Sequence, residues 1–254
     1  MERFNNPDRE YDFYPEDPKP LFRGVWAEKL YSGQELPVGG SVFSETLDTR
    51  LLLDFENFDD ELGGFTEENI NDFFENNRGK YEEYLASFDT DFDPYLHFAC
   101  FQVQQKVAKL LQINEIKKTN IIERMRMYNE RTPKLSEMIG KTMCTERAIL
   151  AQYILQKIGI ESVYVGGVST FSADGEGMED HSFLIIKGKA TPEQSFVFDV
   201  ARPHDDSGVP SIYKTAENFD YDLLKDKESN FLVEANEILT DQKVYFGVGD
   251  PNLF

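Results

Sequence analysis

The chain has 254 residues, of which 40% are hydrophobic and 13% aromatic, a composition typical of a folded globular protein that can bury a sizeable core. Its formal net charge of −21 argues against a nucleic-acid partner, because the phosphate backbone would be repelled. The sequence has no run of about 18 apolar residues, so we expect no membrane-spanning helix and no membrane partner.

Two cysteines, Cys100 and Cys144, are too few for a disulfide framework and suit a reducing compartment. The first residues, Met1 to Arg9, contain no apolar segment of the kind found in secretory signals. We therefore expect a cytoplasmic protein, with export by a specialised secretion system as the alternative. The sequence leaves the oligomeric state open.

Charge is spread unevenly along the chain. Residues 1–95 hold 8 basic and 24 acidic side chains, whereas residues 105–147 hold 10 basic and 5 acidic ones. The acidic front can pack against the basic segment, stay solvated, or dock a basic partner. We favour the first two interpretations, and the third suggests a protein or peptide substrate of basic character.

Residues 1–65 are expected to form an ordered wrap or a small subdomain. Segments 41–43 and 50–53 suit strands or helical turns. Thr66, followed by two glutamates, predicts a helix start, and the Asn-Arg-Gly run at 77–79 can divide that helix in two. Regular structure at the very start is discouraged by Pro7, Pro15, Pro18 and Pro20.

Two more helices are predicted before the middle of the chain. Asp93 is a helix-capping residue and Pro94 suits the first helical position, so a helix should begin there. A third helix is predicted over 115–131. We place a domain boundary between 1–92, an acidic and mostly helical N-terminal part, and 93–254.

The stretch after Cys144 predicts a helix over 144–158, because its apolar residues recur at spacings of three and four and Gly159 can end it. Alternating or apolar runs then predict strands over 162–168, from His181 onward, and over 196–200. This order of elements predicts an α+β fold in which the helix bearing the cysteine packs on an antiparallel sheet.

Residues 169–180 contain two glycines and four acidic residues and predict an exposed, mobile loop. Further strands are predicted around 212–213 and 243–246.

Cys144 is the first candidate for chemistry. The N–H groups and the dipole at the start of a helix stabilise an anion, so a thiol placed there loses its proton more readily. Lys141 and Arg147 add positive charge nearby. The simpler interpretation is a small buried residue at a helix start. We favour a nucleophile, because a histidine and an aspartate follow it on neighbouring strands.

His181 is the candidate base, since an imidazole at the start of a strand and just after a loop can reach the edge of a site. It would take the thiol proton and later protonate the leaving amine. Two other histidines are present. His97 lies in a helical pattern and is expected to be structural, and His204 is a rival base that lies beyond the strand carrying Asp199.

Asp199 interrupts a hydrophobic strand, and a carboxylate there needs a partner because burying an unpaired charge is costly. The partner can be His181, whose tautomer it would fix, or Arg202 in a structural salt bridge. Two cysteines and three histidines at these separations match no compact zinc site, so we expect no metal and no cofactor.

Four segments together resemble the transglutaminase-like superfamily of enzymes with a papain-like fold. The family pattern is a helix that begins with a nucleophilic cysteine, a Gly-Ile step into a strand, a histidine on the next strand and an aspartate on the one after. The resemblance implies a transglutaminase-like catalytic domain over 93–254, with Cys144 as nucleophile, His181 as base and Asp199 as the residue that orients it. The matching segments are Leu135–Ala148, Ile158–Gly167, His181–Leu184 and Phe198–Pro203.

Three features depart from relatives of this family. Ser182 follows the histidine where many relatives have an aromatic residue, and no glutamine precedes the cysteine to complete a papain-type oxyanion hole. The backbone N–H of Cys144 is then the first donor, and the second is unassigned. Arylamine N-acetyltransferases share a similar triad, but their Arg-Gly-Gly stretch is replaced here by Ile-Gly-Lys at 139–141.

The sequence therefore predicts a thiol-dependent acyl-transfer enzyme that hydrolyses a peptide or side-chain amide, as a protease or deamidase does. Transfer to an amine, an arylamine N-acetyltransferase-like activity, and a non-enzymatic interaction module on the same fold are the alternatives.

Overall fold

The computed structural model describes residues 22–37, 50–86, 93–171, 178–187, 195–204, 209–215, 230–233 and 239–244. These residues form helices and antiparallel sheets, as the predicted α+β class requires.

The larger sheet has seven strands in the order β8-β1-β4-β5-β6-β7-β9, and every neighbouring pair is antiparallel. A second sheet pairs β2 (Glu35–Pro37) with β3 (Arg50–Leu52). The strands of the larger sheet are β1 (Phe22–Ala27), β4 (Ser162–Phe171), β5 (Met178–Lys187), β6 (Ser195–His204), β7 (Val209–Thr215), β8 (Asn230–Val233) and β9 (Leu239–Val244).

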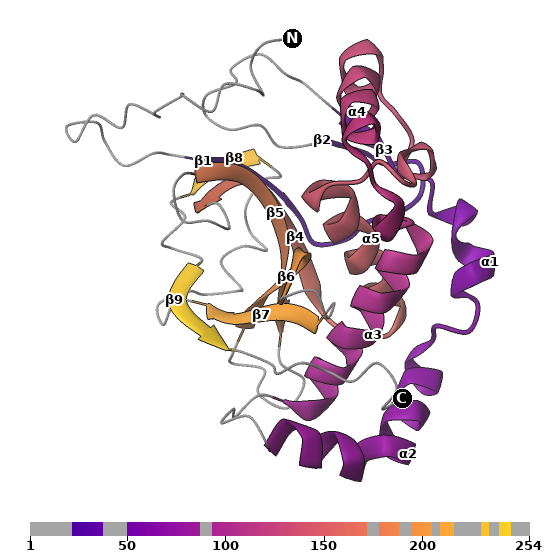
Figure 1. Cartoon of the computed structure of the whole chain (residues 1–254), viewed down its shortest axis with the longest axis vertical. Coiled ribbons are helices and arrows are strands. Elements are labelled where there is room, and N and C mark those ends of the chain that lie inside the picture. The colour runs from indigo at the N-terminus through magenta and orange to yellow at the C-terminus, as the bar shows by residue number, and fades with distance from the viewer. Residues whose placement is uncertain are drawn as a thin grey trace.

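The helices lie together on one side of this sheet (Figure 1). Helix α5 packs on β4, β5 and β6, and α3 packs on α5, α2 and β7. The helices are α1 (Asp59–Leu62), α2 (Glu67–Ala86), α3 (Pro94–Leu110), α4 (Lys118–Glu130) and α5 (Cys144–Lys157), with short 3₁₀ helices at Phe55–Asn57, Ile113–Glu115 and Leu135–Met138.

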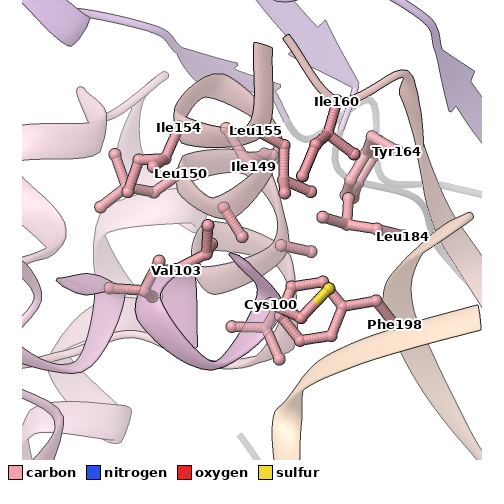
Figure 2. Close-up of a cluster of buried hydrophobic side chains, with 14 of the residues drawn as sticks. Cys100, Val103, Ile149, Leu150, Ile154, Leu155, Ile160, Tyr164, Leu184 and Phe198 are labelled. Carbon is pink, nitrogen blue, oxygen red and sulfur yellow. The ribbon is translucent and has the colours of Figure 1, made fainter. Parts of the chain in front are cut away.

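The core lies between α5 and the sheet (Figure 2). Tyr164, Leu184 and Phe198 come from three neighbouring strands and face the apolar side of α5. Because side chains alternate along a strand, this face of β4, β5 and β6 carries the even-numbered residues. On the helical side the cluster includes Cys100, Val103, Ile149, Leu150, Ile154 and Leu155.

Two predicted boundaries are wrong. Residues 77–79 lie inside α2, which continues for 20 residues. A glycine in a helix interior costs about 1 kcal/mol but does not by itself end a helix. Here Asn77 donates to the carbonyl of Phe73, and Arg78 donates to Glu75 at 2.9 Å, so both side chains support the helix instead of ending it.

Both ends of the predicted loop over 169–180 are strand, at 169–171 and 178–180. Pairing of β4 with β5 resumes after a bulge and joins Val168 to His181 and Phe171 to Met178. His181 therefore lies within β5 and not at its start. Residues 172–177, and the strand or helical turn suggested at 41–43, lie outside the described part of the chain.

The described residues before position 92 share the sheet and core with those after it. β1 lies between β8 and β4, and the amide of Gln152 on α5 donates to the carbonyls of Ala27 at 2.8 Å and Ser162 at 3.1 Å. Buried Asp54 accepts from the backbone N–H of Ser136 at 3.0 Å. The boundary at residue 92 stays a prediction.

The start of α3 allows a first test of this fold. Asp93 caps the helix by accepting from the N–H groups of Tyr95 at 2.9 Å and Leu96 at 3.2 Å, and Pro94 opens it, as predicted. Asp93→Ala should lower the free energy of unfolding by about 1 kcal/mol, whereas Asp93→Asn should keep most of it. Urea denaturation would measure both, and equal losses in the two variants would contradict the capping role.

Candidate active site

Cys144 is the first residue of α5, which runs for 14 residues, and this residue is partly exposed. The other cysteine, Cys100, is buried in α3, and burial followed by the charge of Asp93 raises the pKa of its thiol well above the ordinary value. The two thiols therefore have opposite environments. The predicted helix start is confirmed, and it places Cys144 among the N–H groups of the first turn.

The turn that leads into Cys144 is held from two sides. Gly140 has φ of +72°, in the left-handed region that glycine adopts without steric cost. Its N–H donates to the carbonyl of Leu111 at 2.9 Å, and its own carbonyl accepts from Asn120 of α4 at 2.8 Å. The start of α5 is thus fixed against the end of α3 and the start of α4.

A buried ion pair, which we did not predict, also fixes this helix end. Glu146 is completely buried and accepts from Arg124 of α4 at 2.9 and 2.8 Å and from the hydroxyl of Tyr128 at 2.7 Å. Its second oxygen accepts from the backbone N–H of Met143 at 2.9 Å, which is one half of a capping box. The only local sequence signal was a glutamate at the third position of the predicted helix.

The electrostatic consequences of this pair are large. Burial alone would raise the pKa of Glu146, but the positive charge and hydrogen bonds of Arg124, with the donors Tyr128 and Met143, hold it below its ordinary value. For Arg124, burial alone would lower the pKa, and Glu146 nevertheless raises it. Both side chains are therefore charged at neutral pH.

Three hydroxyl groups join α5 to the sheet beside Cys144. The oxygen atoms of Thr145 and Ser182 lie 3.1 Å apart, and those of Ser182 and Tyr164 lie 3.2 Å apart. Gly166 makes room for this arrangement, because a Cβ atom there would lie 2.2 Å from the Tyr164 hydroxyl. Ser182 of β5 thus contacts both Thr145 of α5 and Tyr164 of β4 through its hydroxyl group.

The backbone of His181 lies in β5 directly before Ser182, and Ser182 contacts the residue after Cys144. The imidazole of His181 lies outside the described side chains, as does that of His204. His97 is buried within α3, with its ring centroid 5.5 Å from that of Tyr81, and burial lowers its pKa to about 3. His97 is thus a core histidine, in agreement with the structural role expected for it.

Asp199 is buried in β6, next to β5 in the sheet, and its carboxylate accepts from the backbone N–H of Ala201 at 3.0 Å. The side chains of its two predicted partners, His181 and Arg202, lie outside the described part of the structure. Cys144, His181 and Asp199 therefore lie on three elements that contact one another, α5, β5 and β6, and their convergence at a triad stays a prediction.

The positive side chains predicted near Cys144 have separate roles. Lys141 donates to the carbonyl of Glu137 at 3.2 Å. Arg147 donates to the carbonyl of Thr142 at 3.3 Å and to that of Ala201 on β6 at 3.4 Å. Arg147 is thus the cation that connects the cysteine helix with the strand of Asp199.

Within the described ranges, no cluster of three or more histidine, cysteine, aspartate or glutamate side chains could hold a metal ion. None of the described helices has the length and apolar character needed to cross a membrane. Comparisons with protein-family models, curated proteins and solved structures found no match to this chain.

Proposed function

We propose that the chain is a thiol-dependent acyl-transfer enzyme of the transglutaminase-like type, which hydrolyses a peptide or side-chain amide. The observation that supports this most is the position of Cys144. It is partly exposed at the start of a long helix, and this helix packs on the two strands that carry His181 and Asp199. A nucleophilic cysteine needs such an electropositive and accessible place.

The proposed reaction proceeds in two stages. His181 takes the proton of Cys144, and the sulfur attacks the carbonyl carbon of the amide. As the C–N bond breaks, the protonated imidazole returns its proton to the leaving amine, and a thioester remains. Water then attacks the thioester with His181 as base, which releases the carboxylic acid and restores the thiol.

Two further groups assist this reaction. Asp199 orients His181 and stabilises the imidazolium that forms. The backbone N–H of Cys144, in the first turn of α5, is the first proposed donor to the oxyanion.

The register of β5 sets a condition on this mechanism. Ser182 and Leu184 lie on the face that α5 covers, so strict alternation does not bring residue 181 to the same face. Proton transfer to His181 requires the strand to depart from alternation there. The bulge between Val165 and Val168 of β4 lies opposite Ser182 and bends the strand that carries the extra residue, which is β4, so the departure at residue 181 would have to arise in β5 itself.

The same register favours the second candidate function, a non-enzymatic interaction module on this fold. If alternation continues through residue 181, the sulfur and the imidazole lie on opposite faces of β5 and cannot exchange a proton. Reactivity of the thiol separates the two functions.

Labelling with a thiol-reactive alkylating probe at pH 6 is the decisive measurement. A thiol whose pKa falls from about 8.5 to about 6 carries about 100-fold more thiolate at that pH. We expect Cys144 to be labelled far faster than Cys100, the labelling to vanish in Cys144→Ala, and its rate to fall in His181→Ala. Cys100→Ala is the matched control and should leave the fast labelling intact. Equal, slow labelling of both thiols would support the interaction module.

The substrate we propose is a protein or peptide, and water is the favoured acceptor. The acidic front of the sequence suits a basic substrate, and neither nucleic acid nor membrane is a proposed partner. Turnover of acetyl-CoA with an arylamine would instead support the acetyltransferase alternative.

A further inference from the structure

Arg147 occupies a central place among the groups described above. It lies one turn after Cys144 on α5 and is partly buried. Its guanidinium donates to the carbonyl of Thr142, two residues before Cys144, and to the carbonyl of Ala201, two residues after Asp199. One side chain therefore joins the segment that leads into the nucleophile with the segment that follows the acid.

The contact with Ala201 extends to Asp199 itself. The N–H of Ala201 donates to the Asp199 carboxylate at 3.0 Å, while the carbonyl of Ala201 accepts from Arg147 at 3.4 Å. Ala201 is thus held from both sides. A shift of the guanidinium would move this part of β6 and, with it, the carboxylate that is proposed to orient His181.

The charges around Arg147 connect it with the same two residues, Cys144 and Asp199. Burial lowers the pKa of Arg147, and negative charge at Cys144, Glu146 and Asp199 acts against that decrease. The guanidinium stays protonated, because its ordinary pKa is far above neutrality. A fixed positive charge near Cys144 favours the thiolate over the thiol.

Other ionisable groups also act on Cys144. The charges of Arg124 from α4 and Tyr164 from β4 interact with that of Cys144. Glu146 on α5 and Asp199 from β6 interact with Arg147, and the proposed base His181 lies on β5. Arg124 is already paired with Glu146 at 2.8 Å. Among the described side chains, this leaves Arg147 as the cation whose charge is shared between Cys144 and Asp199.

We propose that Arg147 is a positioning residue of this site, whose guanidinium holds the segments of Cys144 and Asp199 together and stabilises the thiolate. The catalytic role of Arg147 rests on the proposed function, but its effect on the Cys144 thiol can be measured without turnover of any substrate. The pH dependence of Cys144 alkylation therefore tests the proposal directly.

In Arg147→Gln, the midpoint of the alkylation profile should move up by about one pH unit, which means about tenfold slower labelling on the acid side. Arg126→Gln is the matched control, because Arg126 is exposed and pairs only across one turn, with Glu130 at 3.2 Å. This control should leave the profile unchanged. A folded Arg147→Gln protein with the profile of the unmodified protein would overturn the proposal.

Circular dichroism must show that the variant is folded. If Arg147→Gln does not fold, Arg147→Lys decides the question, since lysine keeps the positive charge but lacks the planar guanidinium that donates to two carbonyls. On the acid side of the profile, Cys144 of Arg147→Lys should then be labelled at a rate within about threefold of that in the unmodified protein. A folded lysine variant that labels as slowly as His181→Ala would overturn the role assigned to the charge.

The two proposals fail in distinguishable ways. If the unmodified protein labels Cys144 and Cys100 equally slowly, the proposed function fails. If its labelling is fast and Arg147→Gln does not slow it, only the role of Arg147 fails.

Discussion

Arg124→Met should lower the free energy of unfolding by about 3–5 kcal/mol, because it leaves the carboxylate of Glu146 charged and buried with only part of its hydrogen bonds. Glu146 is completely buried, and Tyr128 and the N–H of Met143 would be its remaining donors. Guanidinium denaturation measures the loss. Removing the charge as well, in Arg124→Met with Glu146→Gln, should recover a large part of it.

Arg126→Met is the matched control, since Arg126 lies on the same helix but is exposed. Its effect should stay within about 0.5 kcal/mol. If Arg124→Met and Arg126→Met lose similar stability, or if the double variant recovers none, the unpaired buried charge of Glu146 is not the cause of the loss.

The difference in stability between the unmodified protein and Arg124→Met should change with pH in a definite direction. In the unmodified protein the pKa of Glu146 lies below its ordinary value. Its contribution to the free energy of unfolding is therefore fully present above the unfolded pKa of about 4.3, and it is lost as the pH falls through the lower pKa of the folded protein. In Arg124→Met, burial should raise that pKa, and the variant should gain stability on acidification instead. The two stabilities should therefore converge below about pH 4.3.

Gly166→Ala should also be strongly destabilising. The new Cβ atom would lie 2.2 Å from the hydroxyl oxygen and 2.7 Å from the Cζ atom of Tyr164, which is completely buried. Overpacking of this kind costs about 1–3 kcal/mol, and the displaced ring would also disturb its contact with Ser182. Thermal denaturation should show the loss, and labelling of Cys144 at pH 6 should slow.

A second substitution shows whether the clash is the cause. Tyr164→Phe removes the nearer atom and leaves Cζ, so it should offset part of the loss in Gly166→Ala, with a coupling energy of about 1 kcal/mol. Gly79→Ala is the matched control: Gly79 lies in α2 with nothing within 4 Å of its added Cβ, so alanine should stabilise by about 0.5–1 kcal/mol. If the effects of Gly166→Ala and Tyr164→Phe on stability are strictly additive, a direct clash between the two residues is contradicted.

The elements that the sequence predicted well are those encoded by nearby residues. Asp93 and Pro94 mark the start of α3, and the three- and four-residue spacing after Cys144 gives α5 to within one residue of its end. Such signals act within one or two helical turns, so they can be read without knowing the fold.

The errors arose where distant residues decide the structure. The acidic, glycine-containing stretch 169–180 looks like a loop, yet much of it pairs across β4 and β5 beyond a bulge. Local composition does not reveal such pairing.

The pair of Glu146 and Arg124 joins residues 22 positions apart, and the residue before α5 is Met143 and not the serine or threonine that marks a capping box. The order of Cys144, His181 and Asp199 was visible in the sequence. The register of β5 against α5, which sets the condition on the proposed proton transfer, was not.

The position of β1 has a consequence for how the chain is made. Val25 pairs with Gly166 on one side and with Asn230 on the other, so this early strand gains its neighbours only after most of the polypeptide has left the ribosome. Pairings between such remote segments make folding slow. Until then, residues 22–27 have neither partner strand, and a chaperone that shields this segment during synthesis should raise the yield of native protein.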